Sequence, residues 1–189
     1  MFLDIVINTI DEYGMIKKDD CITAALSGGA DSVCLLIILK ELSDKYSFTL
    51  DALHINHCIR GKESDRDEEF CRNLCKKYDI PLTVIRTDVP AAAAESKKSL
   101  EETARDIRYK AFEKHAGDKG KIATAHTVSD NAETVILNMA RGTGLKGLCG
   151  IPPVRDNIIR PLIDVTRQQI EDYLKSMNQG FVTCLLYTS

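Results

Sequence analysis

The segment SGGADS, from Ser27 to Ser32, combines the groups that bind phosphate. Two adjacent glycines let the backbone turn sharply and approach a ligand closely, and the serines offer hydroxyl donors. Apolar residues on both sides predict a buried strand before the segment and a buried helix after it, so its N–H groups lie at a helix N-terminus, which favours an anion. Asp31 repels phosphates unless a cation such as Mg²⁺ lies between them. The segment therefore predicts a phosphate site with a metal.

The second predicted strand, Leu50–Asn56, ends in the polar segment HINH, from His54 to His57, and Arg60 comes shortly after it. This pattern is typical either of a loop that contacts a base or a phosphate, with Arg60 as anion partner, or of an ordinary polar strand end. The carboxyl ends of parallel strands meet at one sheet edge, where ligands bind. That placement, beside the phosphate segment, favours the functional interpretation.

Two carboxylates follow the fourth predicted strand, Lys121–Ala125. Asp130 falls in the first turn of a helix predicted over Ser129–Ala140, Glu133 lies one turn later on the same face, and His126 precedes both. The pair could hold Mg²⁺ or the ammonium of an amine substrate, and a carboxylate or histidine could take the proton that an amine nucleophile must lose. The alternative is an ordinary N-capped helix start, which leaves Glu133 and His126 unexplained.

Basic residues on two further segments are candidates for contacts with phosphate or RNA. Arg105 and Arg108 share a flank of the helix predicted over Ser99–His115, although their spacing alone favours a solvated, salt-bridged face. Arg141 and Lys146 lie in a glycine-rich loop with the spacing G-x-G-x-x-G. This loop follows a helix, whereas the Rossmann dinucleotide-binding fingerprint must follow a strand, so we do not interpret it as that fingerprint. We expect this loop either to close on phosphates or RNA, or to be a plain mobile loop.

Strands that alternate with helices predict an α/β fold, a mainly parallel sheet with helices on both faces. The segment Thr87–Lys98 has neither pattern and is expected to be mobile. The remaining predicted helices are Phe2–Tyr13, Ser32–Tyr46, Glu63–Tyr78 and Thr166–Met177, and the remaining extended segments are Cys21–Leu26, Pro81–Arg86 and Ile158–Leu162.

The composition is that of an ordinary globular protein, with 44% hydrophobic and 28% charged residues in a chain of 189. A net charge of −3 requires any RNA contact to come from a local basic patch or another domain. Seven cysteines without a CxxC pair fit a reducing, cytoplasmic location. No signal peptide or membrane-spanning segment is expected.

The SGGADS segment after a first strand lacks the GK[ST] of a Walker A loop and instead resembles the PP-loop of the N-type ATP pyrophosphatases. That resemblance implies a Rossmann-like PP-loop ATPase fold, of the adenine nucleotide alpha-hydrolase type. It also implies cleavage of ATP to AMP and pyrophosphate through an adenylated substrate.

A longer series of segments, in order along the chain, is similar to the tRNA(Ile)-lysidine synthetase family: SGGADS, HINHCIRG, SLEETARDIRY, AHTVSDNAET, RGTGLKGLCGI and IRPLIDVTRQQIEDYL. The resemblance implies a ligase that adenylates the wobble cytidine of an isoleucine tRNA with a CAU anticodon. Free L-lysine then attacks C2 of that base and AMP leaves. ATP and Mg²⁺ are the implied cofactors, no membrane is involved, and we also consider a homodimer.

By this resemblance the site residues fall into three groups. The residues expected in catalysis are Asp31, which is also near the metal, Arg105, Asp130 and Glu133. Those expected to bind ATP are Ser27, Gly28, Gly29, Ala30, Asp31, Ser32 and His54. Those expected to contact tRNA or phosphate are His57, Arg60, Arg108, Arg141 and Lys146.

The domain prediction is one PP-loop catalytic domain over residues 1–182, followed by a tail over residues 183–189 that departs from the family pattern. We interpret this tail as non-native or as the mark of a truncated reading frame. By this resemblance, we expect the family's C-terminal tRNA-binding domains to be missing from this chain.

Two alternatives compete with this interpretation. A PP-loop tRNA thiolase would need a persulfide or cluster-binding cysteines, and no CxxC pair is present, although the sequence does not exclude Cys58, Cys71 and Cys75. A module that senses ATP without turnover would bind ATP and release no pyrophosphate with lysine and tRNA present.

Overall fold

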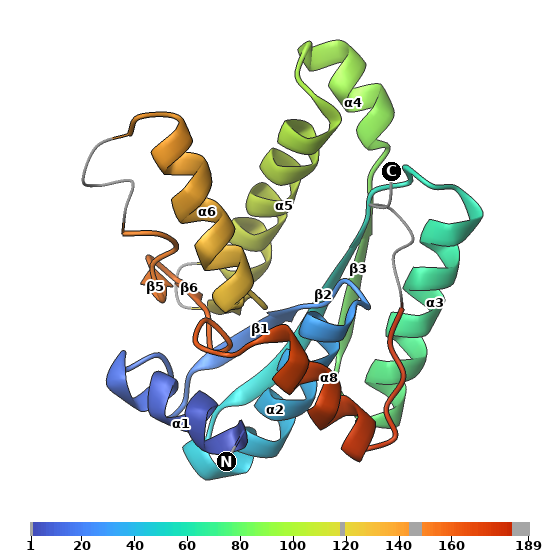
Figure 1. Ribbon diagram of the computed structural model, residues 1–189. Coiled ribbons are helices and arrows are strands. Elements are labelled where there is room, and N and C mark those ends of the chain that lie inside the picture. The colour runs from blue at the N-terminus through green and yellow to red at the C-terminus, as the bar shows by residue number, and fades with distance from the viewer. Residues whose placement is uncertain (1, 118–119, 144–148, 183–189) are drawn as a thin grey trace.

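Six strands form a single sheet in the computed structural model, which describes residues 2–117, 120–143 and 149–182 (Figure 1). Their spatial order is β3-β2-β1-β4-β6-β5, and all neighbours are parallel except the hairpin of β5 and β6. The strands are β1 (Cys21–Ala25), β2 (Thr49–Asn56), β3 (Leu82–Arg86), β4 (Lys121–Ala123), β5 (Val154–Arg155) and β6 (Ile158–Ile159). The predicted mainly parallel α/β fold is confirmed.

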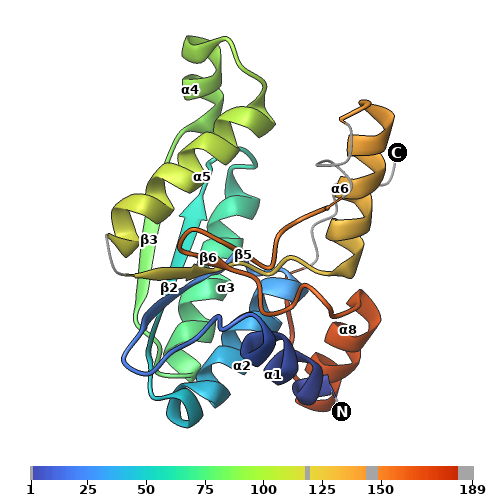
Figure 2. The same cartoon turned by 90° about the vertical axis from the view of Figure 1, so that its left-hand side faces the viewer.

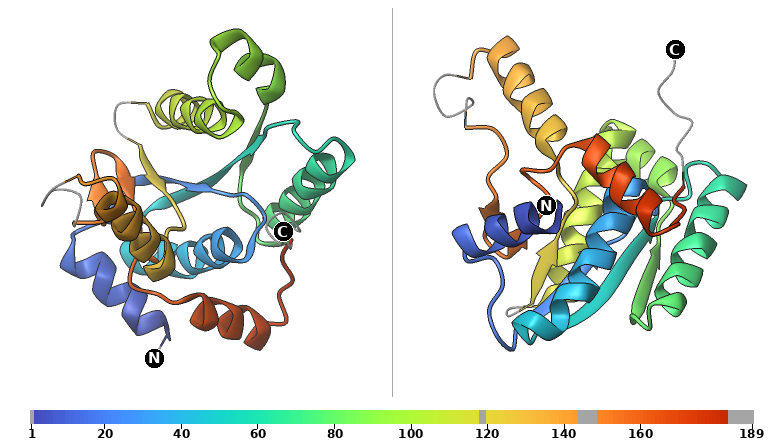
Figure 3. Two further views of the ribbon diagram at one scale, coloured as in Figure 1. Left: turned by 45° about the horizontal axis from the view of Figure 1, so that its top comes forward. Right: turned by 60° about the horizontal axis from the view of Figure 1, so that its bottom comes forward.

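Helices cover both faces of this sheet (Figure 3). Helices α1, α2, α3 and α8 share one hydrophobic cluster with one face, whereas α5 packs on the other face through Phe112 against Leu53 and Ile122. Helix α4 lies against α5. The bounds are α1 (Phe2–Glu12), α2 (Ala30–Tyr46), α3 (Lys62–Lys77), α4 (Val89–Ser96), α5 (Leu100–Ala116), α6 (Val128–Ala140) and α8 (Arg167–Ser176).

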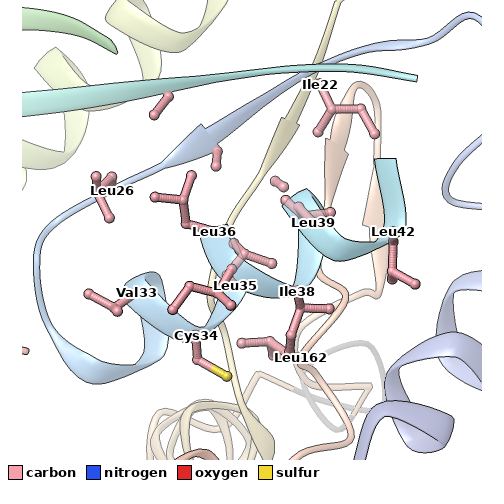
Figure 4. Close-up of a cluster of buried hydrophobic side chains, with 14 of the residues drawn as sticks. Ile22, Leu26, Val33, Cys34, Leu35, Leu36, Ile38, Leu39, Leu42 and Leu162 are labelled. Atoms are coloured by element: carbon pink, nitrogen blue, oxygen red, sulfur yellow. The ribbon is translucent and has the colours of Figure 1, made fainter. Parts of the chain in front are cut away.

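Helix α2 is the centre of the larger cluster. Every residue from Ser32 to Leu39 is buried, because the sheet covers one side of α2 while α8 and neighbouring segments cover the other (Figure 4). Leu162, in the segment after β6, packs among these side chains. The apolar run that predicts a helix against a sheet therefore fixes the position of the α2 N-terminus.

The strand order reverses direction between β1 and β4. The chain runs from β1 outward to β2 and β3, and then returns to place β4 on the other side of β1. Ligands of open parallel sheets bind at such a switch point, outside the carboxyl ends of the strands. The loops after β1 and β4 carry the predicted phosphate segment and the His126–Glu133 segment, so both lie at this point.

Two predicted elements differ from the structure. The segment Thr87–Lys98, for which neither helix nor strand was predicted, contains α4, because Asp88 accepts a hydrogen bond from the N–H of Ala91 and caps this helix. The extended piece over Ile158–Leu162 is shorter than predicted, since only two residues pair.

Among the described residues, no helix is long and apolar enough to cross a membrane.

Helix α6 stands apart from the rest of the fold (Figure 2). None of its residues is buried, and Ile136, Leu137 and Met139 are each more than half exposed. Its attachment to the body is through its first turn, which follows β4. The helix therefore holds its N-terminus at the switch point and projects its C-terminal end into solvent.

Candidate active site

The loop between β1 and α2 is closed by its own serine. The Ser32 hydroxyl accepts hydrogen bonds from the N–H groups of Ser27 and Gly28, both at 3.1 Å, and donates to the carbonyl of Gly29 at 3.0 Å. Ser32 is buried, whereas Ser27 is exposed. The geometry therefore uses Ser32 to shape the loop and leaves Ser27 at its surface, open to a ligand.

Gly28 is the position in this loop that excludes other residues. Its φ is +91°, a conformation that L side chains rarely adopt. An added Cβ would also lie 3.4 Å from both the Cys71 sulfur and the Val182 side chain. The N–H of Val182 donates to the Gly28 carbonyl at 2.9 Å, so the loop is clamped between α3 and the segment after α8.

The N-terminus of α2 is open toward this loop. Gly29 is its N-cap residue, and no side chain caps it in the described structure. The N–H groups of Ala30, Asp31 and Ser32 belong to the first helical turn and have no carbonyl partner within the helix. These donors and the helix dipole could hold an anion, which is the role that the sequence predicts for this segment.

Asp31 carries a cation partner that the sequence does not reveal. Nη1 of Arg167, at the start of α8, donates to both carboxylate oxygens of Asp31 at 2.9 and 3.1 Å. Burial raises the pKa of the Asp31 carboxyl, the nearby Asp130 adds to the rise, and Arg167 opposes it. Asp31 and Asp130 therefore approach each other across the switch point.

His54, near the end of β2, is hydrogen-bonded to the residue just before the phosphate loop. Its Nδ1 lies 2.8 Å from the carbonyl oxygen of Leu26, which can only accept, so Nδ1 carries the proton. Nε2 is then an acceptor, and it is buried without a partner in the described part of the chain. A buried acceptor without a donor is costly, which makes it a candidate for a ligand contact.

His57 lies in the loop after β2. Burial lowers the pKa of His57 to about 4, with further contributions from Arg108 and His54. Its imidazole is therefore neutral at pH 7, and Arg108 projects from α5 close to it. The structure thus brings Arg108, His57 and His54 to one side of the switch point.

Asp130 is part of the start of α6. One of its carboxylate oxygens accepts from the N–H of Thr127 at 2.7 Å and from the Thr127 hydroxyl at 2.9 Å. The cap residue is therefore Thr127, and α6 begins at Val128, one residue before the predicted start at Ser129. Asp130 is half-buried, and the helix start fixes it beside His126.

His126 is surrounded by arginines. Burial lowers its pKa, Arg160 lowers it further, Asp130 opposes this, and Arg108 and Arg105 contribute. Nδ1 lies 3.0 Å from the Thr124 hydroxyl oxygen. A neutral imidazole beside a carboxylate can take up a proton, which suits a general base.

Arg105 lies over the ring of Tyr109, with its guanidinium carbon 5.6 Å from the ring centre. Both residues line a groove of about 470 Å³ between α5 and the β5–β6 hairpin. Arg160 is 3% exposed, and its Nη1 donates to the carbonyl of Pro152 at 2.6 Å. These arginines form a cationic wall beside His126.

Three further predicted residues have other placements in the described structure. Arg60 pairs with Asp67 at 2.8 Å, in the loop after β2. Glu133 is exposed on α6, and Arg141 lies at its far end, roughly 16 Å along the helix axis from Asp130. Lys146 lies outside the described residues. Their predicted roles stay predictions.

The carboxylates fit Mg²⁺ only in part. No group of three or more His, Cys, Asp or Glu side chains that could hold a metal occurs within the described ranges. Mg²⁺ in nucleotide sites is often held by one or two carboxylates together with substrate phosphates, and Asp31 and Asp130 could supply that share. These residues fit a metal that arrives with the nucleotide.

A profile of the PP-loop domain matches residues 4–184, nearly the whole chain. The matched range includes the glycine loop and the N-terminus of α2 at the switch point. The chain belongs to the PP-loop domain family. The ATP pyrophosphatase fold predicted from SGGADS is thereby confirmed.

Curated relatives of this PP-loop chain carry one name. It is 48% identical over 175 residues to the tRNA(Ile)-lysidine synthase of Caldanaerobacter subterraneus subsp. tengcongensis, covering 92% of the chain and 38% of that protein. It is 50% identical over 171 residues to the tRNA(Ile)-lysidine synthase of Clostridium acetobutylicum, covering 89% and 37%. The chain spans less than two fifths of the length of these relatives.

Solved structures share the PP-loop fold at low sequence identity. A U34-tRNA thiolase from Methanococcus maripaludis superposes with a TM-score of 0.74 at 19% identity, over 100% of this chain and 67% of that one. An NH3-dependent NAD synthetase from Campylobacter jejuni gives 0.63 at 17% identity, over 97% and 80%. These likenesses show the fold alone.

Sequence reasoning missed two arginines of this PP-loop site, Arg167 and Arg160. Arg167 occupies the first turn of the last helix, more than a hundred residues from Asp31, so no local pattern links them. Arg160 follows a two-residue strand, and its position directly after a strand at the carboxyl edge is the signal that could have found it.

Proposed function

We propose that this chain uses ATP to join free L-lysine to C2 of the wobble cytidine of an isoleucine tRNA with a CAU anticodon. The products are lysidine, AMP and pyrophosphate. The observation that carries the proposal is the similarity to tRNA(Ile)-lysidine synthases over about nine tenths of this chain. The site adds an anion-binding helix N-terminus that lies beside an acid–base cluster.

In the first step, the C2 carbonyl oxygen of cytidine attacks the α-phosphorus of ATP, and the bond from that phosphorus to the pyrophosphate oxygen breaks. The loop from Ser27 to Gly29 and the free N–H groups of α2 lie where they can hold the polyphosphate and stabilise the charge on departing pyrophosphate. Mg²⁺, when bound, supplies further neutralisation of phosphate oxygens.

In the second step, the ε-amine of lysine attacks C2, and the C–O bond to AMP breaks. The amine must lose a proton to attack, and His126 with its lowered pKa is neutral and close to Asp130. We assign the proton to this pair, His126 as acceptor and Asp130 as the carboxylate that stabilises the resulting charge. Glu133, one turn further along α6, stays the candidate for binding the lysine ammonium.

The cytidine must leave its stack to reach the α-phosphate, which an anticodon loop permits at low cost. Arg105, Arg108 and Arg160 place positive charge beside His126. This local patch supports contact with tRNA phosphates in a chain whose net charge is −3. Tyr109, in the adjacent groove, offers an aromatic edge for an unstacked base.

The test is pyrophosphate release from ATP that depends on both lysine and the tRNA, with nucleoside mass spectrometry of the product. Release with both substrates and a lysine-sized mass gain on cytidine support the proposal. Asp130→Asn should abolish the gain, whereas Asp172→Asn, an exposed carboxylate on α8, should not. A full-length relative serves as positive control, and its activity beside a silent wild-type chain would count against this domain acting alone.

A tRNA thiolase is the second candidate, because the M. maripaludis thiolase shares the fold. Two of the three candidate cysteines do not suit that chemistry. Burial raises the pKa of Cys71 to about 12 and that of Cys75 to about 11, so neither is a thiolate at neutral pH. A sulfur-sized mass gain in the same assay would select this alternative.

We further propose a cytoplasmic location, where tRNA and reducing conditions coincide, and a homodimer. The exposed apolar side chains Ile136, Leu137 and Met139 on α6 support an interface between two copies. Light scattering of the purified chain tests the dimer by its mass. Leu137→Asp should halve a dimer mass, whereas Lys175→Asp, an exposed position on α8, should leave it unchanged.

A further inference from the structure

Arg167 solves an electrostatic conflict in the phosphate site. The carboxylate of Asp31 lies in the first turn of α2, beside the N–H groups that would hold a polyphosphate. An unpaired carboxylate there would repel phosphate oxygens. The guanidinium of Arg167 already neutralises it, with Nη1 shared between both Asp31 oxygens.

Of the remaining donors of Arg167, Nε is used within α8 and Nη2 is not. Nε donates to Glu171 at 2.7 Å, one turn further along α8. Nη2, which carries two N–H bonds, has no acceptor in the described part of the chain. Planar guanidinium groups bind carboxylates and phosphates through parallel N–H bonds, so a group fixed on Asp31 still has donors for an anion.

The ion pair is not needed to attach α8 to the body. Ile170 and Leu174 are fully buried in the cluster formed with α2, and Tyr173 donates to Glu41 at 3.0 Å. Arg167 is about half exposed, and exposed ion pairs contribute only about 0–1 kcal/mol. A purely structural role therefore explains little of its placement.

We propose that Arg167 is a positioning residue of the polyphosphate site, one that bridges Asp31 and the phosphates of a nucleoside triphosphate. Its Nη1 holds Asp31 and cancels the charge of that carboxylate, and its Nη2 donates to a phosphate oxygen. The inference rests on the proposed use of ATP. It adds α8 to the phosphate site and names the polyphosphate, not the adenosine, as the group that Arg167 recognises.

The experiment is calorimetric titration of the purified chain with ATP, pyrophosphate and adenosine in EDTA, so that no metal masks the charge of Asp31. Arg167→Ala should weaken ATP and pyrophosphate at least about tenfold, because a charge-assisted hydrogen bond is lost and Asp31 is uncovered. Adenosine affinity should not change. Arg167→Lys, which keeps the charge and loses the fork, should fall between the two.

A second substitution separates bridging from general damage. Adding Asp31→Asn to Arg167→Ala should recover part of the lost pyrophosphate affinity, because the repelling carboxylate is gone. Arg66→Ala, which removes a comparable arginine–carboxylate pair on α3, is the matched control and should bind like wild type. Circular dichroism melts report whether each variant is folded.

Equal ATP affinity for wild type and folded Arg167→Ala would overturn the inference, as would equal losses for adenosine and pyrophosphate. If Asp31→Asn brought no recovery, the neutralising role would be wrong. The lysidine assay is independent of these titrations. Wild type that binds ATP without making lysidine would contradict the proposed function and leave Arg167 to be judged by affinity alone.

Discussion

Nδ1 of His54 lies 2.8 Å from the carbonyl oxygen of Leu26, the last residue before the phosphate loop. One imidazole therefore joins the end of β2 to the end of β1 and directs an unpartnered Nε2 away from that bond. The residue has two separable roles, one in holding the strand ends and one in offering an acceptor to a ligand.

Substitutions at His54 should separate these roles. His54→Ala should cost about 1–3 kcal/mol of unfolding free energy, because the buried Leu26 carbonyl loses its donor. His54→Asn, whose amide can reach the place of Nδ1, should recover part of that stability and still bind ATP more weakly. Urea unfolding and ATP titration measure the two effects.

His115→Ala is the control for His54. It removes a half-buried histidine that pairs with Asp51, near the opposite end of β2 from the site. Unchanged ATP affinity is expected for it. If His54→Asn bound ATP as well as wild type, Nε2 would have no part in the nucleotide site.

Asp130 should contribute to both folding and chemistry. Asp130→Ala removes the carboxylate that accepts from Thr127, and loss of a helix cap costs about 1 kcal/mol. Thermal unfolding should show this modest loss, while lysidine formation should fall far more steeply. Ser129→Ala, an exposed neighbour outside the cap, should change neither quantity. Activity that fell only in proportion to stability would reduce Asp130 to a cap.

Glu68 should make stability depend on pH. It is 2% exposed, and burial alone would raise its pKa, but hydrogen bonds from Arg86, Asn56 and Arg72 lower it to about 2. The unfolded value is roughly 4.3, so this carboxylate stabilises the fold above that pH and loses its contribution as pH falls toward 2. Wild type should therefore lose stability over this acid window.

Glu68→Gln should lose about 3 kcal/mol at pH 7, since it breaks a buried charge pair, and should show a flatter stability curve between pH 5 and pH 2. Glu69→Gln changes an exposed neighbour and should keep the wild-type pH dependence. Denaturant unfolding at several pH values gives both curves. Parallel curves for Glu68→Gln and wild type would show that another group governs the acid transition.

Cysteine reactivity should follow burial. Cys34, Cys71 and Cys75 are buried with raised thiol pKa values, so native protein at pH 7.5 should leave them unmodified by iodoacetamide. Exposed Cys21, Cys58 and Cys149 should be alkylated. Peptide mass spectrometry reads each site, and rapid alkylation of Cys71 would contradict the tight packing behind Gly28. Unfolded protein in urea gives the full reaction as control.

Local patterns predicted the elements of this fold well where burial and turn chemistry agree. The helix predicted over Ser99–His115 forms as α5, and Ser99 and Glu102 make a capping box at its start. The apolar run after Ser32 forms α2. The pattern failed for α4, because four consecutive alanines have no amphipathic face and the helix depends on the Asp88 cap.

The sequence predicted those site residues that directly follow a predicted strand. The residues after β1, β2 and β4 do meet at one edge, because the strands are parallel. The partner of Asp31 was not predictable, since Arg167 reaches it only through the packing of α8 on α2. Arg60 was predicted to bind an anion, but in the structure it pairs with Asp67. This pairing was not predictable, because it depends on a helix face that buries two adjacent acids, Asp67 and Glu68.

The hydrogen bond from the N–H of Val182 to the carbonyl of Gly28 ties the phosphate loop to the segment after α8. Tension or rotation applied to the chain near Val182 acts first on the carbonyl of the one loop residue that cannot be replaced without strain. A displacement of the backbone at Val182 would therefore reach the loop between β1 and α2 through one hydrogen bond.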